Sequence, residues 1–382
     1  MLIVLFITTL STVSTAALTE DSWNTKTPMT QARAGLGVVA VDGKIYAIGG
    51  ISSFGNVVGT NERYDPKTDT WVTLKPMPTP RSNFAIAAYQ GKIYCISGGG
   101  PTEIYDIATD SWSKNKSVAP FSWGTAVTID EKIFVIQNHE LYMFNPATNK
   151  WTKKTSMSTF TPHNGISVAV DGKLMVCAGF IEYPIQIEMR VLIYDPKTDM
   201  WSDGVWPPFE VGMNAAVATT GVYAPKNVYF MGNLPVVNNY VLGNITVYDP
   251  LKNTWSTTNT NSPTGRANYG TTVVDDVLYV IGGVLVGPEG PYYTEETYVT
   301  TAINEQYVPI EYGFISAPSE TSTTAATSEP NQFTPISTQI IKVVTLVITV
   351  GIVMASLIFY YHKSKLNTIK QNQNIALLYS YS

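Results

Sequence analysis

The chain has 382 residues, of which 45% are hydrophobic and 12% aromatic, so it can bury a sizeable core and is not a disordered protein. Its 24 basic and 29 acidic residues give a net charge of −5, which argues against nucleic acid as a partner, because that role requires a clustered basic surface. With three histidines and two cysteines, the sequence predicts neither a metal site nor a disulfide scaffold, and no cofactor is expected.

Residues 1–17 have features of a secretory signal peptide. The segment carries no charged side chain, opens with large apolar residues and ends in small ones, so cleavage after Ala16 or Ala17 fits. It lacks the usual Lys or Arg at its start. The alternative is a buried N-terminal strand. We favour the signal peptide, which places the following domain, residues 18–315, in the secretory pathway.

An aromatic residue is followed by tryptophan seven positions later at five places in the chain. The pairs are Tyr64 and Trp71, Tyr105 and Trp112, Phe144 and Trp151, Tyr194 and Trp201, and Tyr248 and Trp255. Between them lie segments such as Asp-Pro-Lys-Thr-Asp, whose proline and short polar side chains favour a tight turn. Each unit therefore predicts two antiparallel strands joined by a turn, with both aromatic side chains in the core.

A second hairpin is predicted upstream of each turn. Two short apolar runs flank Asp-Gly, Gln-Gly or a similar pair, a pattern typical of β-hairpins. Six such segments occur, at residues 37–50, 85–98, 125–138, 166–179, 213–233 and 271–283. Four strands per unit at a period of roughly 40–50 residues indicate a repeat architecture.

This pattern resembles the kelch repeat, in which an apolar strand ends in a Gly-Gly doublet and is followed by Tyr and then Trp. Gly49-Gly50 and Gly282-Gly283 match the doublet fully, whereas Ser97-Gly98, Ala178-Gly179 and Gly232-Asn233 match it in part. The resemblance covers about residues 20–315. It implies an all-β fold, a six-bladed kelch-type β-propeller with four antiparallel strands in each blade.

The sixth unit contains Tyr307 but no tryptophan after it. One candidate for its missing outer strand is N-terminal, because Trp23 lies ten residues before Arg33, as Trp71 lies ten before Arg81. The other is local, with Phe314 seven residues after Tyr307. We favour the strand around Trp23, since pairing the two ends of the domain closes the ring and removes an exposed sheet edge.

Three segments follow the predicted propeller. Residues 316–342 are rich in Ser, Thr and Pro, which is typical of an exposed, often O-glycosylated stalk. Residues 343–361 carry no charge and are long enough, as a helix, to cross a bilayer. Lysines in the short tail, residues 362–382, predict that this end is cytoplasmic. With the signal peptide, these features predict a single-pass type I protein of the cell membrane with an extracellular propeller.

The resemblance to peptide-binding kelch domains implies ligand contacts at the opening of each blade's first strand and just after the doublet. The candidates are Arg33, Arg81, Ser82, Ser122, His139, His163, Phe180 and Arg266. The three arginines would recognise an acidic peptide or a sialylated glycan through paired hydrogen bonds. Alternatively, these arginines cap turns and pack their stems between blades.

Other candidate residues lie in loops. The long segment after Gly283 is rich in tyrosine and acidic residues, including Tyr292 and Tyr293, and such loops often form interfaces. Asn115 and Asn244 begin Asn-x-Ser/Thr sequons and are candidates for N-glycosylation.

The two cysteines, Cys95 and Cys177, fall two blades apart and on opposite faces of their strands. Because a disulfide requires close Cα atoms, we expect two buried free thiols.

The sequence thus predicts a membrane-anchored extracellular binding protein, of the receptor or adhesion type, whose partner is a protein or a glycan. No catalytic residue is assigned. Two alternatives stay open. One is a kelch-fold carbohydrate-active enzyme, such as a sugar epimerase, sialidase or oxidase. The other is an intracellular kelch adaptor, if residues 1–17 are not a signal peptide.

Overall fold

The computed structural model describes residues 18–98, 100–115, 119, 124–157, 163–182, 186–207, 215–232, 244–262, 264–285 and 299–313. All of them belong to the first of two compact units, Met1–Ala317 and Pro318–Ser382. The predicted signal peptide, stalk, membrane helix and tail lie outside the described residues and stay predictions. Within the described ranges, no helix is long and apolar enough to cross a membrane.

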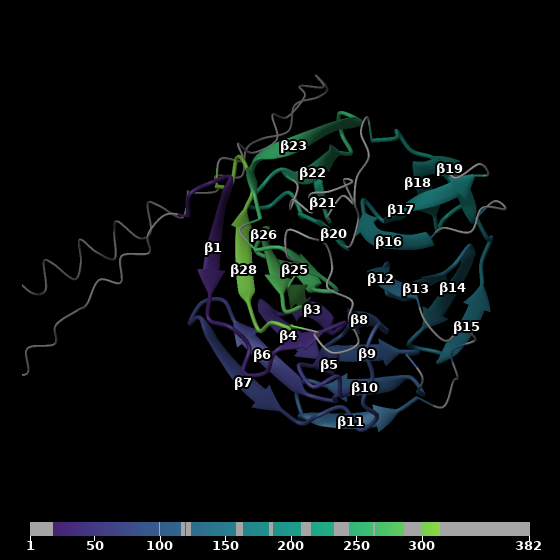
Figure 1. Ribbon diagram of the computed structural model, residues 1–382. Helices are drawn as coiled ribbons and strands as arrows, with labels where there is room; N and C mark the ends of the chain where they lie inside the picture. Colours follow the sequence, from purple (N-terminus) through teal and green to yellow (C-terminus); the bar gives the residue numbers. More distant parts are fainter. Residues whose placement is uncertain are drawn as a thin grey trace, which may run out of the picture. The chain divides into compact units, whose positions relative to one another are not determined.

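The described residues form six four-stranded antiparallel sheets, arranged as blades around a ring (Figure 1). Blade one consists of β3 (Gly37–Val41), β4 (Lys44–Ile48), β6 (Asn61–Asp65) and β7 (Thr70–Leu74). Blade two consists of β8 (Ala85–Tyr89), β9 (Lys92–Ile96), β10 (Glu103–Asp106) and β11 (Ser111–Lys114). Blade three consists of β12 (Thr125–Ile129), β13 (Lys132–Gln137), β14 (Glu140–Asn145) and β15 (Lys150–Lys153).

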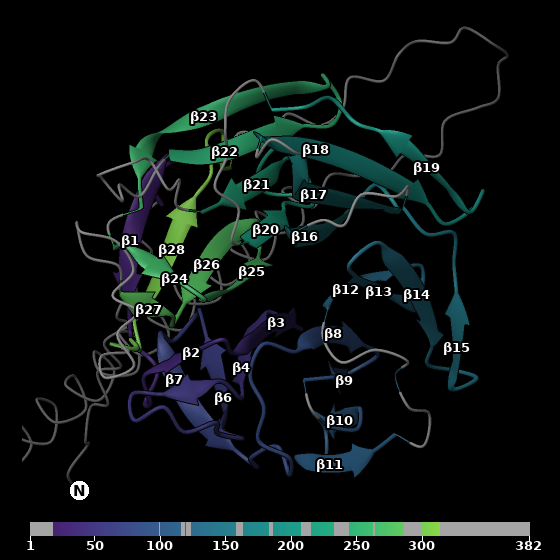
Figure 2. The same ribbon diagram turned by 45° about the vertical axis from the view of Figure 1, so that its right-hand side comes forward.

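Blade four contains the longest hairpin of the described ring (Figure 2). Its strands are β16 (His163–Val170), β17 (Lys173–Glu182), β18 (Gln186–Asp195) and β19 (Met200–Asp203). Blade five consists of β20 (Ala215–Ala218), β21 (Val228–Met231), β22 (Asn244–Asp249) and β23 (Thr254–Asn261). Blade six consists of β25 (Gly270–Val274), β26 (Val277–Ile281), β28 (Asn304–Val308) and β1 (Ser22–Lys26). The all-β six-bladed propeller predicted from the sequence is confirmed.

The core lies between neighbouring blades. The first strand of each blade contacts the first strand of the next, from β3 through β8, β12, β16 and β20 to β25 and back to β3. Apolar side chains from adjacent blades meet in mixed clusters. Ile45 and Tyr64 of blade one, for example, pack with Val277 and Tyr279 of blade six. Because strand residues alternate between faces, each blade can bury one face against each neighbour.

Each blade has two ends, which are distinguished below. The turn end carries the tight hairpin turns, such as Asp42-Gly43, and the Asp-Pro-x-Thr-Asp turns. The loop end carries the glycine doublets and the connections between blades. Two short ladders extend the loop end (Figure 2): β2 (Arg33–Ala34) pairs with β5 (Ile51–Ser52), and β24 (Arg266–Ala267) pairs with β27 (Val284–Leu285).

The two ends of the domain close the ring. Strand β1 pairs antiparallel with β28, and Trp23 lies opposite Tyr307 with their ring centroids 5.3 Å apart. Tyr64 and Trp71 form the same pair in blade one, at 5.0 Å. The N-terminal strand around Trp23 therefore completes blade six, as predicted. Phe314, the local alternative for this outer strand, lies outside the described residues.

The outer strands of successive blades are joined by a repeated contact, which we call the tryptophan latch. The indole nitrogen of Trp71 donates to the Thr27 carbonyl (2.8 Å), and the Thr27 amide donates to Asp69 Oδ1 (2.9 Å). The Tyr64 hydroxyl donates to the same carboxylate oxygen (2.6 Å). The same contacts recur around Trp112, with Lys75, Asp110 and Tyr105, and around Trp201, with Thr155, Asp199 and Tyr194. In each of these blades, one Asp, one Tyr and one Trp thus form hydrogen bonds that connect the blade to the segment after the outer strand of the preceding blade.

Trp23→Ala should destabilise the whole ring, because it removes a large, partly buried aromatic side chain that packs against the core of the closing strand pair. We expect a loss of about 3–5 kcal/mol in the free energy of unfolding, measured by urea denaturation of the full-length chain. The control is Asn24→Ala, since Asn24 is an exposed neighbour on the same strand. Equal stability of the two variants would show that β1 does not complete blade six.

The latch aspartates should make stability sensitive to acid. Hydrogen bonds from the Tyr194 hydroxyl and the Thr155 amide hold the pKa of Asp199 below its ordinary value, although partial burial opposes them. A carboxylate whose pKa is lower in the folded state makes its full contribution to stability at pH values above its unfolded-state pKa, which is about 3.9. This contribution is lost as the pH falls through the pKa of the folded state.

Blade five provides a natural neutral version of the latch, because the Tyr248 hydroxyl donates to the side-chain oxygen of Asn253 (2.7 Å). Asp199→Asn should therefore cost only about 1 kcal/mol at pH 7 and flatten the fall in stability below about pH 4. The reciprocal Asn253→Asp should steepen that fall. Parallel stability curves for wild type and both variants between pH 2 and 7 would contradict this account.

Candidate functional site

The three arginines that precede the first strands of blades one, two and six are buried. Arg33, Arg81 and Arg266 are 0%, 1% and 1% exposed. Each pairs with a glutamate that lies two residues before the tyrosine of its own blade. The ion pairs are Arg33 with Glu62 (2.5 Å), Arg81 with Glu103 (2.7 Å) and Arg266 with Glu305 (2.5 Å).

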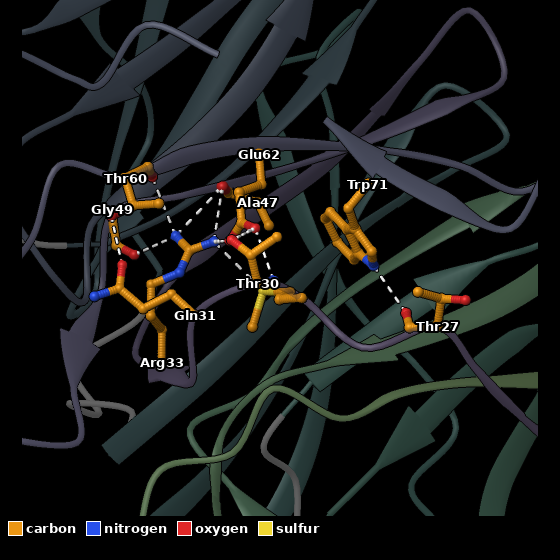
Figure 3. A network of polar contacts seen from close by, with 10 residues as sticks. Thr27, Thr30, Gln31, Arg33, Ala47, Gly49, Thr60, Glu62 and Trp71 are labelled. Atoms are coloured by element: carbon orange, nitrogen blue, oxygen red, sulfur yellow. Dashed lines mark hydrogen bonds and ion pairs between the residues drawn. The ribbon is translucent and has the colours of Figure 1, made fainter. Parts of the chain in front are cut away.

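Backbone carbonyls accept further hydrogen bonds from the terminal nitrogens of each guanidinium group, as Figure 3 shows for Arg33, whereas the Nε atoms of Arg33 and Arg266 have no partner among the described residues. Arg33 donates to the carbonyls of Gly49 (2.8 Å) and Thr60 (3.1 Å), and Glu62 also accepts from the Thr30 amide (2.9 Å). Arg81 and Arg266 repeat this arrangement. Arg81 donates to Ser97 and Pro101, and Arg266 to Gly282 and Ile303. Each arginine thus joins the end of its blade's second strand to the segment that leads into the third.

Burial lowers the pKa of Arg33, and the charge of Glu62 opposes that effect. The ordinary pKa of arginine is so high that the guanidinium group stays charged. Its charge is neutralised inside the blade by Glu62. The prediction that Arg33, Arg81 and Arg266 recognise an acidic peptide or a sialylated glycan is therefore wrong. Their charge is buried and paired. The alternative, that these arginines are structural, accounts for the geometry.

The glycine doublets fit against the arginine segment of the following blade. The Gly50 amide donates to the Arg81 carbonyl (2.9 Å), and the Gly283 amide donates to the Arg33 carbonyl (2.8 Å). A Cβ atom at Gly49 would lie 2.6 Å from the Arg81 carbonyl oxygen, and one at Gly282 would lie 2.5 Å from that of Arg33. Both glycines also have positive φ angles, so a side chain is excluded by space and by backbone conformation.

The remaining rim candidates are only partly described. Ser82 and His139 are half-buried at the loop end, and the His139 carbonyl accepts from the Met157 amide (2.9 Å). His163 opens β16 and Phe180 lies in β17, but their side chains are not described. Ser122, Tyr292 and Tyr293 lie outside the described residues. A ligand role for these seven residues stays a prediction, as does N-glycosylation of Asn115, which follows β11, and Asn244, which opens β22.

Cys95 and Cys177 are buried and form no disulfide, as predicted. Burial raises the pKa of the Cys95 thiol far above its ordinary value, so this group is unreactive in the folded protein. Among the described residues, no group of three or more His, Cys, Asp and Glu side chains could hold a metal ion.

An apolar patch at the loop end was missed by the sequence analysis. Phe54 is 90% exposed, and Val57, Leu285 and Val299 are exposed by 46%, 36% and 54%. We call these four residues the Phe54 patch. Phe54 and Val57 belong to the loop between β5 and β6, whereas Leu285 and Val299 flank residues 286–298. No local sequence pattern reveals the patch, because its two halves are more than 200 residues apart.

The two halves of the Phe54 patch are held together. Ser53 and Thr300 form a hydrogen bond between their hydroxyl groups (2.8 Å), and the Leu285 amide donates to the Val299 carbonyl (3.0 Å). The Ser52 amide donates to the Asn56 carbonyl (2.9 Å), which closes a tight turn under Phe54. An aromatic ring on a braced turn loses little conformational entropy when it binds, which suits an interface contact.

Comparisons with known proteins agree with the fold. Residues 32–78 match the family model described as "Kelch motif". Kelch-like protein 23 of Homo sapiens is 26% identical over 186 residues, which cover 47% of this chain and 32% of that protein. A putative F-box/kelch-repeat protein of Arabidopsis thaliana is 27% identical over 157 residues, 41% of each chain. The N-acetylneuraminate epimerase of Pasteurella multocida is 23% identical over 203 residues, 49% of this chain and 48% of that enzyme.

A solved structure described as "Structure of YjhT" covers 72% of this chain and 95% of its own, with a TM-score of 0.56 and 15% sequence identity, which is a likeness of fold. The chain is thus a six-bladed β-propeller with similarity to kelch-repeat proteins. This chain spans less than half the length of the curated relatives named above.

Arg81→Ala should unfold the protein more easily rather than weaken a ligand site. It leaves the buried Glu103 carboxylate without its counter-charge and three backbone carbonyls without a donor. We therefore expect a loss of about 3–5 kcal/mol in the free energy of unfolding, measured by urea denaturation. Arg63→Ala, at a half-buried position in β6, is the matched control. A stable Arg81→Ala variant would return Arg81 to the list of ligand candidates.

Proposed function

We propose that this kelch propeller is a membrane-anchored extracellular binding protein, of the receptor or adhesion type, which contacts a protein or glycan partner through its loop end. Kelch propellers generally mediate binding to other proteins, and the two kelch relatives named above are compatible with that role. The extracellular location rests on the sequence of residues 1–17 and 343–361.

The Phe54 patch is the observation that supports the loop end as the binding surface. Exposed apolar side chains gathered on one surface, rather than scattered singly, mark interaction sites. The patch also flanks residues 286–298, whose sequence contains Tyr292 and Tyr293, and tyrosine is enriched at protein interfaces. Because the three arginines are buried, we expect the contact with the partner to be apolar rather than salt-dependent.

A second candidate function is a carbohydrate-active enzyme. The similarity to the N-acetylneuraminate epimerase supports it, since that protein covers about half of this chain. The two functions differ in their consequences. A binding protein retains its ligand unchanged, whereas an epimerase interconverts the two forms of its sugar without retaining either.

The test uses intact cells that express the full-length chain with an epitope tag after Ala326, in the predicted stalk. Staining without permeabilisation reports the side of the membrane, and a membrane-impermeant cross-linker captures partners at the surface. We expect staining of intact cells and cross-linked adducts with the wild-type chain. Phe54→Ser should reduce the adducts at least about tenfold, as loss of an aromatic anchor does.

Leu251→Ser is the matched control, because Leu251 is also a highly exposed apolar residue (82%) but lies at the turn end. It should leave the adducts unchanged. Staining only after permeabilisation would favour the intracellular adaptor. Equal adducts with both variants would remove the Phe54 patch from the interface. Interconversion of N-acetylneuraminate anomers by the purified chain, with no adducts, would favour the enzyme.

A further inference from the structure

A second group of exposed apolar side chains lies at the turn end, where the described chain leaves blade six. Val222 and Tyr223, in the loop between β20 and β21, are 64% and 46% exposed. Ile310, which follows β28, is 41% exposed, and Tyr312 is half-buried. We call these four residues the Tyr223 patch. It is separate from the Phe54 patch, which lies at the opposite end of the blades.

The loop that carries Val222 and Tyr223 is fixed by a buried carboxylate. In the other five blades a two-residue turn joins the first strand to the second, whereas blade five uses residues 219–227. Asp276 of blade six is 1% exposed. Its Oδ2 atom accepts from the amides of Val222 (2.9 Å), Tyr223 (2.7 Å) and Ala224 (3.1 Å). Because three successive amides share one acceptor, the loop presents its apolar side chains in a fixed position and loses little conformational entropy on binding.

The chain that leaves blade six is attached to the same loop. The rings of Tyr223 and Tyr312 are stacked, with their centroids 6.3 Å apart and an interplanar angle of 25°. The Gly313 amide donates to the Tyr223 carbonyl (2.6 Å). The segment that leads to the predicted stalk therefore starts at the Tyr223 patch, and its next two residues in the sequence, Phe314 and Ile315, are apolar as well.

The sequence after Gly313 indicates which surface the patch meets. Residues 314–342 connect the patch to residues 343–361, the predicted membrane span. A flexible chain of this length has an average end-to-end distance of about 30 Å. If residues 343–361 span a bilayer, which is the part of the proposed function on which this inference rests, the patch stays within reach of the lipid. Tethering of this kind gives effective concentrations in roughly the millimolar range, so a weak apolar contact is enough for docking.

We propose that the Tyr223 patch docks on the lipid surface of the membrane that anchors the chain. Val222 and Ile310 provide apolar side chains that can enter the headgroup region, and tyrosine is enriched at membrane–water interfaces. Docking directs the turn end toward the lipid. The Phe54 patch, at the opposite end of the blades, is then left free to contact a partner.

The lipid that fits the patch is zwitterionic. An anionic surface is recognised by clusters of basic side chains. Lys226 and Lys252, at the turn end of blade five, are instead paired with Asp171 (2.7 Å) and Asp249 (2.9 Å). Their charges are balanced by these carboxylates, so the apolar and aromatic side chains dominate the contact. Phosphatidylcholine is therefore the lipid used in the test.

The experiment places the full-length chain in phosphatidylcholine vesicles and measures lipid contact with a fluorophore at residue 222. Cys95 and Cys177 are buried, so an environment-sensitive fluorophore labels the introduced cysteine of Val222→Cys selectively. Phe54→Cys, labelled in the same way at the loop end, is the matched control. Lipids with a nitroxide on the headgroup quench only fluorophores that contact the membrane surface. We expect nitroxide lipid to quench the fluorophore at residue 222 and to leave the one at residue 54 unchanged.

Two double variants, each made in the labelled Val222→Cys chain, test whether the patch causes the docking. Tyr223→Ser with Ile310→Ser removes two side chains of the patch and should lower the ratio of docked to undocked chains at least about tenfold. Val57→Ser with Leu285→Ser removes two apolar side chains of similar exposure from the Phe54 patch. This second pair should leave the quenching unchanged.

Alkaline extraction of the same vesicles separates failure of docking from failure of the membrane anchor. A chain that resists extraction but shows no quenching at residue 222 would overturn the docking alone. A chain that is extracted would overturn both. Blue-shifted emission at residue 222 without quenching would show that protein covers the patch, either residues 314–317 or a second copy, and would also overturn the docking. Equal quenching at residues 222 and 54 would do the same, because the contact would then be unspecific.

Discussion

Closure of the ring by β1 and β28 is the constraint on which the rest of the structure depends. Each blade buries its two faces against neighbours, so the fold has no free sheet face only if the sixth blade meets the first. Blade six supplies three strands from the C-terminal part of the domain, and Trp23 brings the fourth from the N-terminal part. The side chains that pack between other blades are therefore stable only when the two ends of the domain are paired. Asp21 extends this dependence, because it accepts from Tyr307 and from the Asn259 amide of blade five (3.3 Å).

Among the described residues, the buried Arg–Glu pairs lie on one side of the ring. They occur in blades six, one and two, which are neighbours around the closing junction. A buried ion pair adds little net stability compared with an apolar core, but it tolerates few alternative arrangements. Here each guanidinium group fits one set of carbonyls at the loop end of its blade. We interpret the three pairs as fixing how the blades nearest the junction sit on one another.

The fold was predictable because its signals are periodic. The Tyr-to-Trp interval, the hairpin turns and the position of Trp23 all follow from the spacing of residues along the chain. The role of the arginines did not follow from the same spacing, because it depends on a partner across the sheet. A signal was nevertheless present: Glu62, Glu103 and Glu305 lie two residues before the tyrosine in the blades that carry these arginines. The Phe54 patch was not predictable, since Leu285 and Val299 lie far from Phe54 in the sequence and only the closed ring brings the two halves together.

The pairing of β1 with β28 also determines how a mechanical force on the C-terminal end would act on the domain. If residues 343–361 anchor the chain as proposed, force reaches the propeller through residues 309–313 and then β28. That strand is not an edge strand, because it pairs with β26 on one side and β1 on the other. Pulling along its axis must shear both ladders together instead of unzipping one hydrogen bond at a time. Because β1 lies outside β28, the strand nearest the anchor is paired on both sides. In a local closure, the strand after Tyr307 would be nearest the anchor and would lie at the edge of the sheet. A propeller attached by its C-terminal end therefore benefits directly from being closed by its N-terminal one.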